Sequence, residues 1–304
     1  MQRTAILGPV AFLLSHGAVH AADAPRILAA VSDWTLDFAD ERCSLIREFA
    51  DGDDRIRLQL DTFGPIGRGY LVMISGDLVP GSGVTPVTGF RMSYSPDTGE
   101  RAQFQIPIGR FGRENAVSFS AGFLPYELPA MTPGVPQAAD GPESTFQRNI
   151  THVTAEFARR EPFRLDTGSM AAPFAAMRQC VDDLVASWGI DPVAYRAHSQ
   201  QAQLGGQSNA LLAPADGKDA ADWNERHMKR ILASTPAGRR RRASRGPESP
   251  RGRPTACALQ VAYASESYRQ AVCEMLSEVA YRPALDAEGR PVPSFIQIDM
   301  RSLK

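Results

Sequence analysis

The sequence predicts an α+β fold with a β-rich N-terminal domain, one packed helix and a small C-terminal α+β domain. Two observations predict it: short alternating runs of apolar and polar residues recur from about residue 31 to residue 165, and a strand-helix-turn-strand pattern closes the chain. A length of 304 residues suits two domains of roughly 100 to 200 residues each. The 43% hydrophobic and 22% charged residues, with a net charge of -1, are ordinary globular values that do not point to a nucleic-acid partner.

The N-terminus has the pattern of a secretory signal peptide over residues 1–21. Arg3 precedes an apolar run from Ala5 to Leu14, and Val19-His20-Ala21 resembles a cleavage site. A buried first helix is the alternative, which the polar residues that follow Ala21 disfavour. No other stretch approaches the roughly 20 apolar residues that span a bilayer. We therefore expect an exported, periplasmic or otherwise extracytoplasmic, soluble chain without a transmembrane segment after cleavage.

Four cysteines in an exported chain favour two disulfides over a metal site, because no Cys-x-x-Cys pair or His/Cys cluster places ligands together. Three pairings are possible. We favour Cys43 with Cys180 and Cys257 with Cys273, since each pair then lies inside one predicted domain. The alternative of four reduced core cysteines would require a cytosolic protein.

The N-terminal domain, residues 22–197, is predicted from period-two alternation. Residues 34–38 have the pattern Trp-Thr-Leu-Asp-Phe, and residues 56–60 repeat it. Residues 43–49 form a third candidate strand, closed by the Asp51-Gly52-Asp53 turn. Short strands at this spacing predict an antiparallel sandwich or open barrel. The further candidate strands are residues 70–74, 87–94, 102–108, 116–121, 150–157 and 162–165.

One helix closes this domain over residues 170–188. Its apolar residues recur at helical spacing and the pattern ends at Gly189, which predicts an amphipathic helix. We interpret the stripe as core packing rather than a cofactor site. Cys180 lies beside it, so a bond to Cys43 would join the helix to an early strand. The stripe consists of Phe174, Met177, Val181, Leu184 and Trp188.

Residues 198–222 are rich in Gln, Ser, Gly and Ala, which predicts a linker before a C-terminal domain at 223–304. A short helix over 223–233 precedes a basic run. No aromatic residue interleaves that run, so it offers bases no stacking platform. A solvated loop is the favoured interpretation, and contact with an anionic lipid, lipopolysaccharide or cell-wall polymer is the alternative. The run consists of Arg239, Arg240, Arg241 and Arg242.

The turn Asp166-Thr167-Gly168-Ser169 is similar to the active-site turn of aspartic proteases, in which two aspartates share a proton. Only one copy is present, and helix capping by Asp166, Thr167 or Ser169 explains the same residues more simply. Other nucleophile, metal and phosphate motifs are absent from the sequence. We therefore predict a non-enzymatic protein without a cofactor or metal, and keep an aspartic-type peptidase using Asp166 as an alternative.

The C-terminal pattern predicts a strand over 256–263, a helix over 267–280 and a turn over 286–289 before a final strand. Ser267 and Gln270 have the spacing of a capping box. Cys273 would project from the helix toward Cys257. The predicted buried face of the helix consists of Tyr268, Val272, Met275, Leu276 and Val279.

Residues 281–292, Tyr-Arg-Pro-Ala-Leu-Asp-Ala-Glu-Gly-Arg-Pro-Val, resemble the run between helix and last strand in the C-terminal domain of TonB-family proteins. The resemblance covers mainly residues 254–304 and looks like a disulfide-bearing variant of that domain. It implies a last strand that accepts a partner peptide by β-augmentation. The candidate edge consists of Ser294, Phe295, Ile296, Gln297 and Ile298.

The chain departs from an energy transducer of that family, because it has no membrane-anchoring helix and no long Pro-rich spacer. We therefore expect a periplasmic protein-interaction module that binds an envelope protein or peptide by strand addition. The alternative is a TonB-linked accessory of envelope transport.

Overall fold

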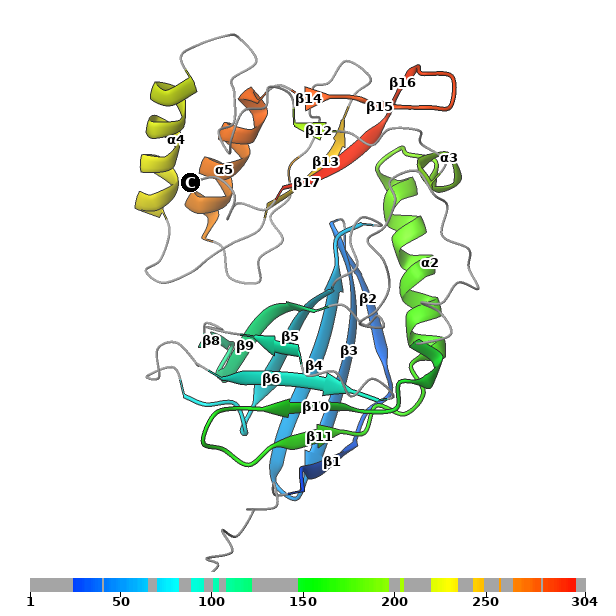
Figure 1. Cartoon of the computed structure of the whole chain (residues 1–304), viewed down its shortest axis with the longest axis vertical. Helices are drawn as coiled ribbons and strands as arrows, with labels where there is room; N and C mark the ends of the chain where they lie inside the picture. Colours follow the sequence, from blue (N-terminus) through cyan, green and yellow to red (C-terminus); the bar gives the residue numbers. More distant parts are fainter. Residues whose placement is uncertain are drawn as a thin grey trace, which may run out of the picture.

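The computed structural model describes residues 24–39, 41–64, 70–81, 89–95, 101–103, 108–121, 147–196, 203–204, 220–234, 243–248, 257, 265–279 and 281–298. The fold is mixed α+β, with one large sheet and few helices in these segments (Figure 1). The predicted signal peptide, the arginine run 239–242 and the predicted strand 256–263, apart from Cys257, lie outside the described residues.

Eleven strands form the large sheet, and all their pairings are antiparallel except that between β1 and β11. The strand order is β7-β6-β10-β11-β1-β3-β4-β5-β9-β8, with β2 paired to β3 beside this path. The strands are β1 (Arg26–Ala30), β2 (Thr35–Ala39), β3 (Arg42–Asp51), β4 (Asp54–Thr62), β5 (Tyr70–Gly76), β6 (Phe90–Tyr94), β7 (Arg101–Gln103), β8 (Ile108–Phe111), β9 (Glu114–Ala121), β10 (Val153–Glu156) and β11 (Phe163–Leu165).

Strand β1 joins two halves of this sheet. Its first residues pair in parallel with β11, and Ala29 and Ala30 pair with β3. The β6, β10 and β11 half crosses the β3 to β5 half in Figure 1, and the rings of Phe90 and Phe119 lie 4.9 Å apart between them. The predicted strand-rich fold is confirmed. The parallel pair was not predicted, because the alternating pattern starts only after β1.

Only the two ends of the predicted strand 102–108 lie within the described residues, because 104–107 lie outside them. Its two ends belong to β7 and β8, which lie at opposite ends of the strand order.

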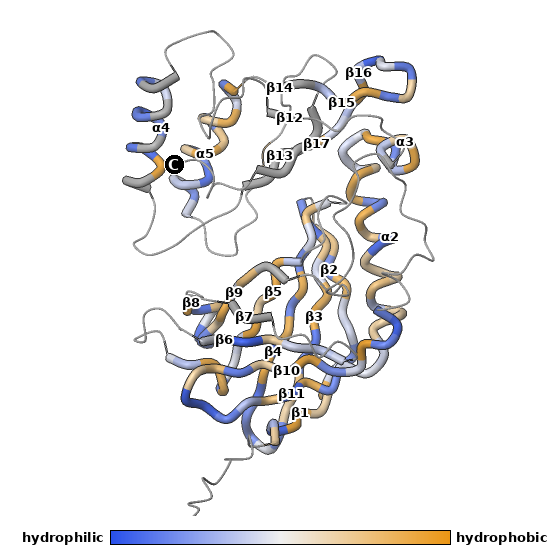
Figure 2. Tube along the Cα trace, in the orientation of Figure 1, coloured by the Kyte–Doolittle hydropathy of each residue, from blue (hydrophilic) through white to orange (hydrophobic). Residues whose placement is uncertain are grey.

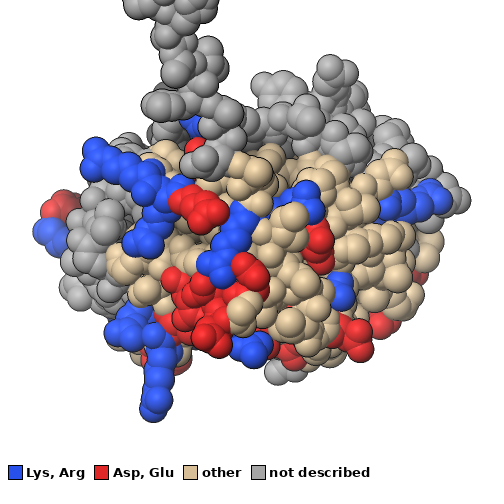
Figure 3. All heavy atoms as spheres, turned by 90° about the horizontal axis from the view of Figure 1, so that it is seen from below, with Lys and Arg blue, Asp and Glu red and all other residues tan. Residues whose placement is uncertain are grey.

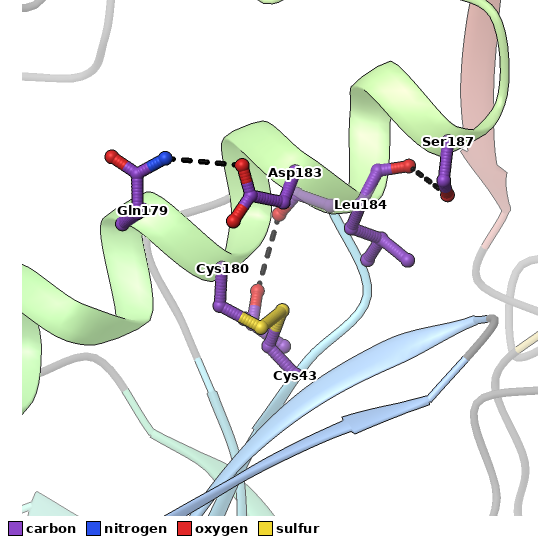
Figure 4. Close-up of a disulfide and its surroundings, with 8 residues drawn as sticks. Cys43, Gln179, Cys180, Asp183, Leu184 and Ser187 are labelled. Carbon is purple, nitrogen blue, oxygen red and sulfur yellow. Dashed lines mark hydrogen bonds between the residues drawn. A yellow bond between two sulfur atoms is a disulfide. The ribbon is translucent and has the colours of Figure 1, made fainter.

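Helix α2 (Ala171–Ser187) packs on β3 and corresponds to the predicted helix 170–188. The apolar stripe is buried apart from the partly buried Trp188, and Figure 2 shows apolar segments along both α2 and the strands. Cys180 forms the predicted disulfide with Cys43, with 6.1 Å between their Cα atoms (Figure 4). The bond therefore joins the helix to the sheet within the core.

The lower face of the N-terminal domain mixes acidic and basic side chains (Figure 3). Arg26 at the start of β1 donates from Nε to Asp51 Oδ2 and from Nη1 to Asp54 Oδ2, each at 2.6 Å. Asp51 ends β3 and Asp54 begins β4, on either side of Gly52, which has a positive φ of 60°. These partly exposed ion pairs tie β1 to the β3–β4 hairpin.

The described residues from 203 onward, here called the C-terminal unit, form two helices and three two-stranded sheets, β12-β14, β13-β17 and β15-β16. Residues 203–204, inside the predicted linker, pair with β14, and the predicted helix 223–233 starts three residues earlier than expected. The elements after α2 are α3 (Pro192–Arg196), β12 (Gln203–Leu204), α4 (Ala220–Ser234), β13 (Ala243–Glu248), α5 (Glu266–Glu278), β14 (Tyr281–Arg282), β15 (Ala284–Leu285), β16 (Pro291–Val292) and β17 (Ser294–Ile298).

Helix α5 confirms the predicted buried face, all five members of which are buried. Its predicted capping box is wrong: the N-cap is Ser265, whose hydroxyl accepts a hydrogen bond from the Tyr268 amide. Gln270 instead donates to Glu274 Oε1 at 2.9 Å, one turn further along the helix. Cys273 forms the predicted disulfide with Cys257, with Cα atoms 5.7 Å apart.

The predicted turn 286–289 is confirmed. The Gly289 amide donates to the Asp286 carbonyl, and the Asp286 carboxylate accepts hydrogen bonds from the amides of Glu288 and Arg290. The Arg290 amide bond is the largest cause that holds the pKa of Asp286 below its ordinary value. Gly289 has a φ of 78°, which favours glycine at this turn position.

A polar layer lies on the face of β4 that points away from the core. Leu58 and Leu60 belong to the core, so the intervening Gln59 and the following Asp61 point to the opposite face. Both are nearly inaccessible to solvent, and Gln59 Nε2 donates to Asp61 Oδ1 at 2.8 Å. Burial raises the pKa of the Asp61 carboxyl above 3.8.

This burial predicts a pH dependence of stability. Because the folded chain holds a proton on Asp61 at a pH where the unfolded chain has lost it, the free energy of unfolding rises as pH falls from above the raised pKa toward 3.8. In Asp61→Asn this contribution is lost. Urea unfolding at several pH values should show a smaller gain on acidification for the variant, whereas parallel curves for the two proteins would contradict the prediction.

Candidate partner-binding edge

Strand β17 contains the five residues of the predicted edge, and β13 already pairs with it. Among the described strands, β17 pairs with β13 alone, in antiparallel register from Ala243 opposite Ile298 to Glu248 opposite Ser294. The register shifts between Arg245 and Glu248. Gly and Pro lie between these two residues, and proline has no amide hydrogen to donate, which accounts for an irregular ladder.

Phe295 is not exposed on this strand. It is 1% exposed and packs with Val185 and Ile190, at the end of α2 and just beyond it. Its ring centroid lies 5.4 Å from that of Trp188 and 5.1 Å from that of Tyr195 in α3. Phe295 therefore attaches the predicted edge to the N-terminal domain.

Gly64, just after β4, completes this contact from the sheet side. A Cβ atom at Gly64 would lie 2.7 Å from Phe295 Cζ, and the φ of Gly64 is 139°. Both the close approach and the backbone conformation favour glycine here. A second link joins the two units at Arg269 of α5, whose Nη1 lies 3.8 Å from Glu41 Oε2.

Helices α4 and α5 are joined by a cluster around Glu278. Trp223 Nε1 donates to Glu278 Oε2 at 2.7 Å, and His227 Nε2 lies 3.4 Å from the same oxygen. The rings of Trp223 and His227 are 4.5 Å apart. Their four-residue spacing marks one helix face, but the carboxylate that joins them lies on another helix, so the sequence did not reveal the cluster.

Asp166 lies just after β11 with its side chain half exposed. Arg164 Nε lies 3.2 Å from its Oδ1, and its backbone amide donates to the Leu28 carbonyl. Its neighbours also hold the chain between β11 and α2: Arg47 Nη1 donates to the Thr167 carbonyl at 2.7 Å, and the Ser169 hydroxyl accepts from the Ala171 amide. The predicted helix capping by Asp166, Thr167 or Ser169 is wrong, because the N-cap of α2 is Met170 and no side chain caps it.

The described residues contain no group of three or more His, Cys, Asp and Glu side chains that could hold a metal ion. Within the same segments, no helix combines the length and apolar character that crossing a membrane requires.

Comparisons with known proteins do not assign this chain to a family. The chain matches no family model, no curated protein and no solved structure. The resemblance of residues 281–292 to the TonB C-terminal domain stays a prediction.

The burial of Phe295 predicts a large cost for its removal. Phe295→Ala should lower the free energy of unfolding by about 3 to 5 kcal/mol, since truncating a buried phenylalanine loses apolar contact and leaves a cavity. Phe38→Ala is the matched control, because that side chain is half exposed. Urea unfolding measures both effects. Equal small losses in the two variants would show that Phe295 does not hold the units together.

Proposed function

We propose that this chain is an exported, non-enzymatic protein-interaction module that binds an envelope protein or peptide in the periplasm through the backbone of β17. The irregular pairing of β13 with β17 is the observation that carries this proposal. β13 includes a proline and a register shift, so a regular partner strand can pair with Ser294–Ile298 in one register more completely than β13 does.

The contacts of Phe295 give the bound partner a defined position. Main-chain hydrogen bonds of an added strand run along β17, while Phe295 fixes this strand against α2 and α3. A partner bound here lies at the junction of the two units. Such binding uses rigid elements of both units, which lowers the ordering cost of association.

Three further features support the proposal. Disulfides persist in oxidising compartments, so the two bonds are compatible with an exported protein. The ion pair of Asp166 with Arg164 and the backbone contacts of its neighbours give this motif a structural role. The resemblance to the TonB C-terminal domain implies the same strand-addition mode.

Site-specific crosslinking tests the proposal. A photo-crosslinking amino acid at Gln297 of the full chain, expressed in the periplasm of a Gram-negative host, should trap a defined envelope protein. The same amino acid at Ala287, an exposed position in the neighbouring turn, is the matched control and should trap none. Failure to obtain any adduct at Gln297, or the same adducts at both positions, would argue against β17 as the binding strand.

A further inference from the structure

Exposed apolar side chains are concentrated in sequence between residues 27 and 38. Among the described residues, five large hydrophobic side chains are exposed, and four of them lie between residues 27 and 38. Leu36 and Phe38, which are 39% and 50% exposed, alternate on β2. Ile27 and Val31 are 49% and 50% exposed, in β1 and just after it. Of these four, only Leu36 and Phe38 share one strand, and neighbouring exposed apolar residues on one strand mark a candidate interaction surface.

Strand β2 lies at an edge of the large sheet. It pairs with β3 through five consecutive residue pairs, and no other described strand pairs with it. Further along, the same edge of β3 pairs with β1. Four of the five residues of β2 are exposed, and the strand lies beside α2 (Figure 1).

The register places the two exposed apolar residues on one face. Leu36 lies opposite Leu45 and Phe38 lies opposite Cys43, so both share the face on which Cys43 bonds to α2. Asp37 lies opposite Ser44 on the other face, with its side chain half exposed and 3.9 Å from Arg42 Nη2. The edge of β2 therefore combines backbone groups, two apolar side chains and one carboxylate.

Edge strands are usually protected by proline, lysine, a bulge or a covering segment. The sequence of β2, Thr-Leu-Asp-Phe-Ala, contains neither proline nor lysine, and its ladder with β3 is continuous. Helix α2 lies beside β2 but leaves four of its five residues exposed. We propose that the outer edge of β2 is a second interaction surface, which binds an extended peptide segment with alternating apolar and basic residues.

Charge determines this choice of partner. A second copy of the chain that overlapped all five residues of β2 in antiparallel pairing would place Asp37 opposite its own equivalent, and like charges directly opposite are destabilising. A basic residue at that position of the partner would instead face Asp37, while its apolar neighbours would contact Leu36 and Phe38. This surface is separate from β17 and does not depend on the function proposed for that strand.

A peptide-binding measurement on the full chain with both disulfides tests the inference. The probe is a fluorescein-labelled nine-residue peptide of alternating valine and lysine, and its affinity is measured by fluorescence anisotropy. The double variant Leu36→Ser/Phe38→Ser should weaken binding at least tenfold. The matched control Ile27→Ser/Val31→Ser removes two side chains of similar exposure and should change the affinity less than twofold.

A charge exchange keeps the test independent of folding defects in the double variant. Asp37→Lys should weaken binding of the valine-lysine peptide at least tenfold and should improve binding of a valine-glutamate peptide. Asp53→Lys, at an exposed turn residue, is the matched control and should alter neither affinity.

Three results would overturn the inference. The first is unchanged affinity in Asp37→Lys, and the second is an equal loss in the Ile27→Ser/Val31→Ser control. The third is a dimer of the unmodified chain in light scattering that Leu36→Ser/Phe38→Ser abolishes, which would assign the edge to a second copy instead.

Discussion

The disulfide between Cys43 and Cys180 is the constraint on which the arrangement of this chain depends. It joins residues 137 positions apart and fixes α2 on β3. The end of α2 and the turn beyond it provide the residues that surround Phe295. The position of β17 thus follows from the bond between helix and sheet, because a helix held elsewhere would not bring Trp188 to this strand.

The two proposed binding edges, on β17 and β2, differ in their present contacts within the chain. Strand β17 is paired with an irregular strand of its own chain, and its Phe295 is buried at the junction of the units. Strand β2 presents exposed apolar residues at the edge of the large sheet. A partner at β17 competes with or supplements an internal pairing, whereas a partner at β2 extends the sheet. The two proposals therefore assign to one chain two extended partners that bind by the same backbone chemistry.

The sequence was sufficient where helical periodicity or the small number of cysteines limits the choices. Helical periodicity predicted four of the buried residues of α5 and the buried Val279 that follows it, and the division into domains predicted both disulfides. Long-range pairing was not accessible: β1 shows too little alternation to predict its parallel partner β11, and β13 contains residues depleted from strands. The burial of Phe295 depends on Gly64 and Tyr195, which lie far away in sequence. The choice of Ser265 over Ser267 as the cap is decided by helix geometry within one turn.

The effect of removing the Cys43–Cys180 bond on stability tests this account most directly. Loop-closure entropy for 137 residues gives a loss of about 5 kcal/mol in Cys43→Ala/Cys180→Ala, against about 3 kcal/mol for the 16-residue loop in Cys257→Ala/Cys273→Ala. Urea unfolding of the intact chain and both double variants measures these losses under one set of conditions. The account predicts the larger loss for the Cys43 and Cys180 pair. A loss below about 1 kcal/mol for that pair, well short of the 2 to 5 kcal/mol usual for a native disulfide, would contradict it.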